Sequence, residues 1–90
     1  MDKQRRLRAE DVPEGGCVPG VIGGKQVAIF KVEGKLYATQ ANCTHRGGPL
    51  CEGSLWGEVV TCPWHGSQFD VRTGEVVSGP ATEPLETFKL

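Results

Sequence analysis

Short apolar runs broken by glycine and proline dominate the pattern of hydrophobic and polar positions along the chain. The segment QVAIFKVEGKLYATQ carries β-branched and aromatic residues on both sides of residues 33–34, which is typical of two antiparallel strands joined by a tight turn. Before it, residues 18–22 predict a short strand that ends at a turn over residues 23–24. Pro19 has no backbone N–H and therefore favours an edge position for this strand.

The second half of the chain continues this pattern. Residues 58–61 predict a strand that leads into a loop containing Cys and His, QFDVRTGEVVSGP predicts a hairpin that turns near residues 73–74, and PLETFKL alternates apolar and polar positions as a strand does. No segment holds a 3.6-residue period over a useful length, and only RAEDVPEG suits a brief helical turn. We therefore expect an all-β fold, a small antiparallel sandwich or open barrel from which two loops project.

Composition limits the class of protein. A chain of 90 residues with 38% hydrophobic content and no internal repeat makes one small domain, so we treat residues 1–90 as a single unit. The formal net charge of -1 gives no support to a nucleic-acid-binding protein, which needs a strongly basic surface. The first 15 residues contain no apolar signal-peptide core, and no stretch reaches membrane-spanning length. We expect a cytoplasmic protein with no nucleic-acid or membrane partner.

Candidate chemistry is concentrated in two loops that contain Gly and Pro. They read Cys43-x-His45, then sixteen residues, then Cys62-x-x-His65, and they use both histidines of the chain. Two Cys and two His can form a tetrahedral zinc site, but zinc modules usually space each ligand pair as C-x2-4-C or H-x3-5-H. In a Rieske centre one iron takes two cysteines and the other iron takes two histidines. Loops that each supply one Cys and one His suit such a cluster better than a single zinc ion.

The chain also resembles the Rieske iron-sulfur family in its sequence motifs. The resemblance lies in CTHRGGPL and CPWHGSQFD, and it extends to DVPEGG, the hairpin with LYA, the RTGEV turn and the GPATEPLETF tail. It implies a [2Fe-2S] cluster held by loops at about residues 43–50 and 62–69, with a proline loop at about residues 79–81 that closes over the cluster. The implied ligands are Cys43 and Cys62 on the inner iron and His45 and His65 on the outer iron.

Four positions indicate which branch of the family the chain resembles. Members from respiratory and photosynthetic cytochrome complexes carry one further cysteine in each loop, and these form a disulfide beside the cluster, whereas the matching residues here are Gly48 and Trp64. The chain is therefore similar to the Rieske-type ferredoxins of soluble oxygenase systems. Ser67 keeps a hydroxyl that bonds a cluster sulfide in the family, but Phe69 replaces a tyrosine that donates a second such bond. We expect a midpoint potential in the lower half of the roughly -150 to +300 mV range of Rieske centres.

Structural roles are expected for most other residues that could carry chemistry. Cys51 is predicted to be a partly buried free thiol and Cys17 a packing residue, because disulfides are rare in a reducing cytosol. Asp70 and Glu75 are predicted to be surface carboxylates without a catalytic role. An apolar collar that excludes water and receives partners is expected beside the ligands, although Trp64 suits a core position equally well. The members of this collar are Pro49, Leu50, Trp64 and Pro80.

The resemblance implies a function in electron transfer. The expected role is a one-electron carrier between a flavoprotein ferredoxin reductase and a terminal oxygenase of the aromatic-ring-hydroxylating type, with no catalysis by the chain itself. Ninety residues leave no room for the mononuclear iron domain of an oxygenase large subunit, which favours a carrier over an enzyme. Two alternatives remain open. They are a small Rieske-like redox subunit of a larger reductase, such as nitrite reductase, and a zinc-stabilised interaction module.

Overall fold

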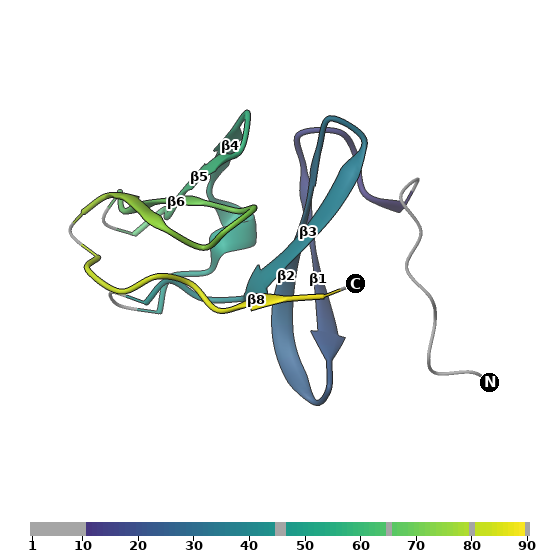
Figure 1. Cartoon of the computed structure of the whole chain (residues 1–90), viewed down its shortest axis with the longest axis horizontal. Coiled ribbons are helices and arrows are strands. Elements are labelled where there is room, and N and C mark those ends of the chain that lie inside the picture. Colours follow the sequence, from purple (N-terminus) through teal and green to yellow (C-terminus); the bar gives the residue numbers. More distant parts are fainter. Residues whose placement is uncertain (1–10, 45–46, 65, 80, 90) are drawn as a thin grey trace.

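The computed structural model describes residues 11–44, 47–64, 66–79 and 81–89. These residues form two four-stranded antiparallel sheets with the strand orders β1-β2-β3-β8 and β4-β5-β6-β7. Figure 1 shows the two sheets at opposite ends of the molecule. The elements are β1 (Cys17–Ile22), β2 (Lys25–Val32), β3 (Lys35–Gln40), the short 3-10 helix η2 (Leu50–Glu52), β4 (Ser54–Trp56), β5 (Val59–Thr61), β6 (Gln68–Asp70), β7 (Val76–Ser78) and β8 (Thr87–Phe88).

The predicted all-β class is confirmed. The described ranges contain no α-helix, only short 3-10 segments. No helix in these ranges is long and apolar enough to cross a membrane.

The first sheet is organised by the hairpin that the sequence predicted. Strands β2 and β3 pair up to Val32 and Lys35, and the turn residues Glu33 and Gly34 have φ angles of 50° and 80°. Two consecutive positive φ angles are what a type I′ hairpin turn requires. Strand β1 lies at the edge of the sheet, as predicted for a strand that contains Pro19.

Strand β2 contributes to hydrophobic clusters on both faces of its sheet. Val27 and Ile29 pack into one cluster, whereas Ala28 and Phe30 pack into the other, as the two-residue period of a strand requires. The second cluster extends toward the other sheet and therefore joins the two halves of the molecule. Its members from beyond the first sheet include Cys43, Leu50, Cys62 and Phe69.

The second sheet is made of strands of three residues each. The predicted strand over 58–61 is confirmed as β5, and the predicted β6–β7 hairpin turns through Gly74, which has a φ of 84°. Strand β4 was not predicted, because it is short and its Trp56 is 80% exposed, so that no alternation is visible. Strand β8 is shorter than PLETFKL predicted and covers only Thr87–Phe88.

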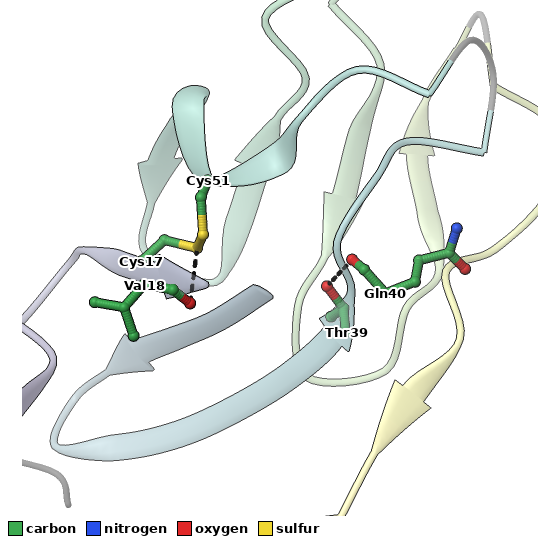
Figure 2. Close-up of a disulfide and its surroundings, with 5 residues drawn as sticks. All are labelled: Cys17, Val18, Thr39, Gln40 and Cys51. Atoms are coloured by element: carbon green, nitrogen blue, oxygen red, sulfur yellow. Dashed lines mark hydrogen bonds between the residues drawn. A yellow bond between two sulfur atoms is a disulfide. The ribbon is translucent and has the colours of Figure 1, made fainter. Parts of the chain in front are cut away.

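The prediction for two of the cysteines is wrong. Cys17 in β1 and Cys51 in η2 form a disulfide, with 5.2 Å between their Cα atoms (Figure 2). This separation lies within the range of about 4.4–6.8 Å that disulfides adopt. The two cysteines are 34 residues apart in sequence, and the packing of η2 against β1 brings them together. Neither cysteine has a neighbour in sequence that would indicate this pairing.

Candidate metal centre

The first candidate loop, residues 43–48, follows β3 and is closed by two backbone hydrogen bonds. The N–H of Cys43 donates to the carbonyl of Gly48 at 2.8 Å, and the N–H of Gly47 donates to the carbonyl of Cys43 at 2.9 Å. Gly47 has a φ of 78°, a left-handed conformation that glycine adopts without the steric cost of a Cβ. Asn42 fastens the loop further, because its Nδ2 donates to the Gly47 carbonyl at 2.9 Å.

The second candidate loop, residues 62–67, joins β5 to β6 and repeats the same backbone pattern. The N–H of Cys62 donates to the carbonyl of Ser67 at 2.8 Å, and the N–H of Gly66 donates to the carbonyl of Cys62 at 3.1 Å. Gly66 has a φ of 81°. The two loops therefore form a structural pair, each with a cysteine first and a left-handed glycine four residues later. The match in sequence is limited to the Cys, His and Gly of each loop, and the shared hydrogen-bond pattern becomes visible only in the structure.

The cysteines that begin the two loops are buried together. Cys43 and Cys62 are 4% and 3% exposed and belong to the same hydrophobic cluster. Gly48 brings the first loop against the second, because a Cβ at this position would lie 2.7 Å from the Sγ of Cys62. Both predicted cysteine ligands thus lie in a dry region where the loops meet.

The predicted histidine ligands, His45 and His65, fall outside the described residues. In sequence, position 65 lies between the exposed residues Trp64 and Gly66, whereas Thr44, before position 45, is half-buried. Within the described ranges, no three His, Cys, Asp or Glu side chains gather closely enough to hold a metal ion. The four-residue ligand set therefore stays a prediction.

Ser67 is fully buried and connects the second loop to the predicted proline loop. Its Oγ accepts a hydrogen bond from the N–H of Ala81 at 3.0 Å, and the residue is 0% exposed. Because a hydroxyl can donate one hydrogen bond while it accepts others, this contact leaves the Ser67 proton for a further acceptor. Pro80 lies outside the described residues, so the closure of residues 79–81 over the cluster stays a prediction.

Two further side chains attach the segment before β8 to the first loop. Thr44 Oγ1 donates to the carbonyl of Glu83 at 2.8 Å. The Gln40 amide binds at both ends, because its Oε1 accepts from the N–H of Glu86 at 2.8 Å and its Nε2 donates to the carbonyl of Asn42 at 2.9 Å. Nothing in the sequence near Thr44 or Gln40 indicates these contacts. Their partners lie 39 and 46 residues away, beyond the reach of any local pattern.

The predicted apolar collar is only partly present. Leu50 is 1% exposed and lies in the core, so its assignment to the collar is wrong. Trp64 is 55% exposed, and its ring lies against Gly48, where a Cβ would be 2.9 Å from the ring. Pro49 is half-buried, and Pro80 lies outside the described residues. Trp64 therefore covers the first loop and still presents much of its surface to solvent.

Charged side chains beyond the second loop form a separate network. The Arg72 Nη2 and Nε donate to the two carboxylate oxygens of Asp70 at 2.9 and 3.1 Å. These side-chain hydrogen bonds hold the pKa of Asp70 below its ordinary value of 3.8, although its partial burial acts in the opposite direction. Arg72 also lies 3.7 Å from Glu58, so the network links the β6–β7 turn to the β4–β5 hairpin. This arrangement agrees with the structural role predicted for Asp70.

Comparison with known proteins decides between the metal sites that the ligand spacing left open. The Rieske [2Fe-2S] domain matches residues 2–89 of the chain. The chain belongs to the Rieske [2Fe-2S] domain family. Its cofactor is a Rieske-type [2Fe-2S] cluster, and the zinc-stabilised module loses its support.

Relatives of this Rieske protein are ferredoxin components of dioxygenase systems. The chain is 39% identical over 81 residues to the ferredoxin component of the naphthalene 1,2-dioxygenase/salicylate 5-hydroxylase systems of a Ralstonia species, covering 90% of this chain and 78% of the relative. It is 43% identical over 91 residues to the biphenyl dioxygenase ferredoxin subunit of a Pseudomonas species, covering 100% of this chain and 84% of the relative.

A solved structure gives a similar result. The complex of reduced oxygenase and oxidized ferredoxin in carbazole 1,9a-dioxygenase contains a chain that matches with a TM-score of 0.83 and 39% identity, covering 90% of this chain and 76% of that chain.

The described residues fit a cluster of this kind. Iron-sulfur clusters are held by thiolates, and the Rieske type needs two of them on one iron. Cys43 and Cys62 meet this requirement, since each starts one of the paired loops and both are buried. Gly48 keeps the backbone close to the Cys62 sulfur in a place that a Cβ would fill.

Proposed function

We propose that this Rieske protein is the ferredoxin of a multicomponent oxygenase system. It carries one electron from a flavin-dependent ferredoxin reductase to a terminal oxygenase that acts on an aromatic or similarly apolar substrate. The observation that carries the proposal is the similarity, over 90% and 100% of the chain, to ferredoxin components of naphthalene and biphenyl dioxygenase systems. Such a carrier makes and breaks no substrate bonds, so the chain is not itself an enzyme.

The burial of the two cysteines supports the ligand assignment. The thiols of Cys43 and Cys62 lie in the core, whereas Trp64 and Gly66, which flank position 65 in sequence, are exposed. We assign Cys43 and Cys62 to the inner iron, and His45 and His65 to the outer iron, in the arrangement of a Rieske centre. When bound, the cluster supplies a one-electron redox couple.

The chain's own residues exclude water from the cysteine side of this centre and leave the histidine side accessible to partners. Leu50 and Phe69 lie in the same buried cluster as the two thiols and keep water from them. On the histidine side, Trp64 is 55% exposed and Gly66 is also exposed, so a partner can approach there closely. Electron exchange with both partners is therefore expected at the histidine end of the loops.

We place the protein in the cytoplasm. Reduced nicotinamide cofactors, the usual electron source of flavin-dependent reductases, are available there. The net charge of -1 supports protein partners rather than nucleic acid.

Reconstituted electron transfer tests this function. The purified holo-protein is mixed with NADH, a flavin-dependent ferredoxin reductase and the terminal oxygenase of a naphthalene or carbazole dioxygenase system. We expect the reductase to bleach the visible spectrum of the protein, and product formation by the oxygenase to rise with the concentration of the protein. The His65→Ala variant should support neither step. Reduction followed by transfer to a nitrite reductase, with none to any oxygenase, would contradict the proposal.

A further inference from the structure

A second pair of cysteines lies next to the first candidate loop and takes no part in the proposed ligation. Cys17 belongs to β1, at the edge of the first sheet, and Cys51 belongs to η2, which begins two residues after the loop. Figure 2 shows their sulfur atoms joined between the two elements. The disulfide therefore ties the exit of the first loop to the first sheet.

The position of η2 is coupled to the loop through Leu50. This residue precedes Cys51, is 1% exposed and packs in the hydrophobic cluster that contains Cys43. Its N–H donates to the carbonyl of Ala41, on the other side of the loop, at 3.0 Å. A displacement of η2 would therefore shift the backbone at both ends of the first loop, which contains the proposed ligand Cys43.

Access to the four sulfur atoms is unequal. Cys17, on the edge strand β1, and Cys51, in η2, are half-buried, whereas Cys43 and Cys62 are 4% and 3% exposed. A reductant can therefore reach the disulfide more easily than the proposed ligands. In a cytoplasmic protein, disulfides are usually transient, catalytic or redox-sensing rather than permanent.

We propose that Cys17 and Cys51 form a reversible thiol–disulfide site whose oxidation state controls how firmly the first loop retains the cluster. A dithiol reductant of the cell opens the site by exchange through a mixed disulfide. The Cys17–Cys51 bond breaks, both sulfur atoms take up a proton, and the dithiol becomes a disulfide, so that two electrons and two protons are transferred. The one-electron couple of the cluster cannot supply this reduction alone. The inference rests on the proposed cluster ligation.

Graded reduction of the holo-protein tests the site. The protein is equilibrated with mixtures of reduced and oxidised dithiothreitol, the state of each cysteine is read by alkylation and mass spectrometry, and cluster loss to an iron chelator is followed by visible absorbance. We expect alkylation to appear at Cys17 and Cys51 together, and cluster loss to become at least about fivefold faster. Hydrogen exchange in residues 41–53 should accelerate in parallel, which gives a readout that does not depend on the cluster. Reoxidation should restore both properties.

Matched variants separate the site from direct effects of the dithiol. The Cys17→Ser/Cys51→Ser protein should lose its cluster at the fast rate in every mixture, whereas Val21→Ser, an exposed change on the same strand, should behave as the wild type. Two free thiols under all oxidising conditions would overturn the inference. So would an intact disulfide whose reduction changes neither cluster loss nor hydrogen exchange. If the double variant does not fold, the wild-type series alone decides. A preparation without iron and sulfide would instead refute the proposed function.

Discussion

At the scale of single residues, small side chains set how closely the two loops approach the buried thiols. A Cβ at Gly48 would lie 2.7 Å from the Cys62 sulfur and 2.9 Å from the Trp64 ring, closer than side chains pack. We therefore expect Gly48→Ala to cost about 1–3 kcal/mol of unfolding free energy and to lower cluster occupancy. Gly79→Ala is the matched control, because its Cβ would meet nothing closer than 3.8 Å. Iron content and denaturant unfolding check both variants, and equal behaviour of the two would contradict the packing argument.

Ser67 is expected to influence the midpoint potential. Its Oγ accepts from Ala81, and its proton is free to bond a cluster sulfide, which carries more negative charge in the reduced state. Only the part of the bond energy that differs between the two redox states changes the potential, so removing a hydrogen bond of about 1.5–3 kcal/mol to a charged group would lower it by up to roughly 60–130 mV, at 59 mV per tenfold change for one electron. Redox titration of Ser67→Ala checks this, with the exposed Ser78→Ala as control. A Ser67→Ala protein with a full cluster and the wild-type potential would refute the assigned bond.

At the scale of elements, the hairpins were predictable and the contacts between distant elements were not. The turns at residues 33–34 and 73–74 could be predicted, because the positive φ angles that they require fall on or beside a glycine. Strand β4 gave no such signal, since its three residues show no apolar alternation. The Cys17–Cys51 disulfide depends on residues 34 apart, and no local pattern encodes that separation. The candidate ligands were visible because their spacing is local to each loop, whereas the side chains that fasten the loops were not.

Gln40 is expected to hold the first loop to the segment before β8. Gln40→Leu removes the side-chain bonds to Glu86 and Asn42 together, and both partners are exposed, so water can replace the lost bonds. We expect a loss of about 0.5–1.5 kcal/mol in unfolding free energy and faster release of the cluster to a chelator. Gln26→Leu, at an exposed position of β2, is the control. Indistinguishable unfolding curves for the two variants would show that this attachment contributes nothing.

The Asp70–Arg72 pair should make the β6–β7 turn sensitive to acid. The hydrogen bonds from Arg72 lower the pKa of Asp70 in the folded protein, so the carboxylate stabilises the fold above its ordinary pKa of 3.8. This contribution is lost as the pH falls through the lowered, folded-state pKa. Asp70→Asn should therefore cost less than about 1 kcal/mol near neutral pH, because the pair is partly solvated, and nothing in strong acid. Urea unfolding across pH measures the difference, with Glu75→Gln as control. A deficit that persists below the lowered pKa would contradict the ion-pair explanation.

At the scale of the whole molecule, the two sheets have different tasks. The first sheet is covered by hydrophobic clusters on both faces of β2, and it provides the stable base. The second sheet consists of three-residue strands, and the second loop joins two of them, β5 and β6. The first loop follows β3 of the first sheet and packs against the second loop. Such a small domain buries a modest surface, so the disulfide and the metal centre are both expected to add to its stability.

In the proposed centre, cysteines hold one iron and histidines hold the other. The chain has four cysteines, so an all-cysteine cluster is the sharpest rival, and the Cys17–Cys51 disulfide argues against it. Pulsed electron paramagnetic resonance on the dithionite-reduced protein, labelled with nitrogen-15 in histidine only, tests this most directly. We expect couplings from the nitrogens of both His45 and His65, with one of them lost in His65→Ala if a cluster is retained. A reduced cluster that shows no histidine coupling would refute the mixed ligation.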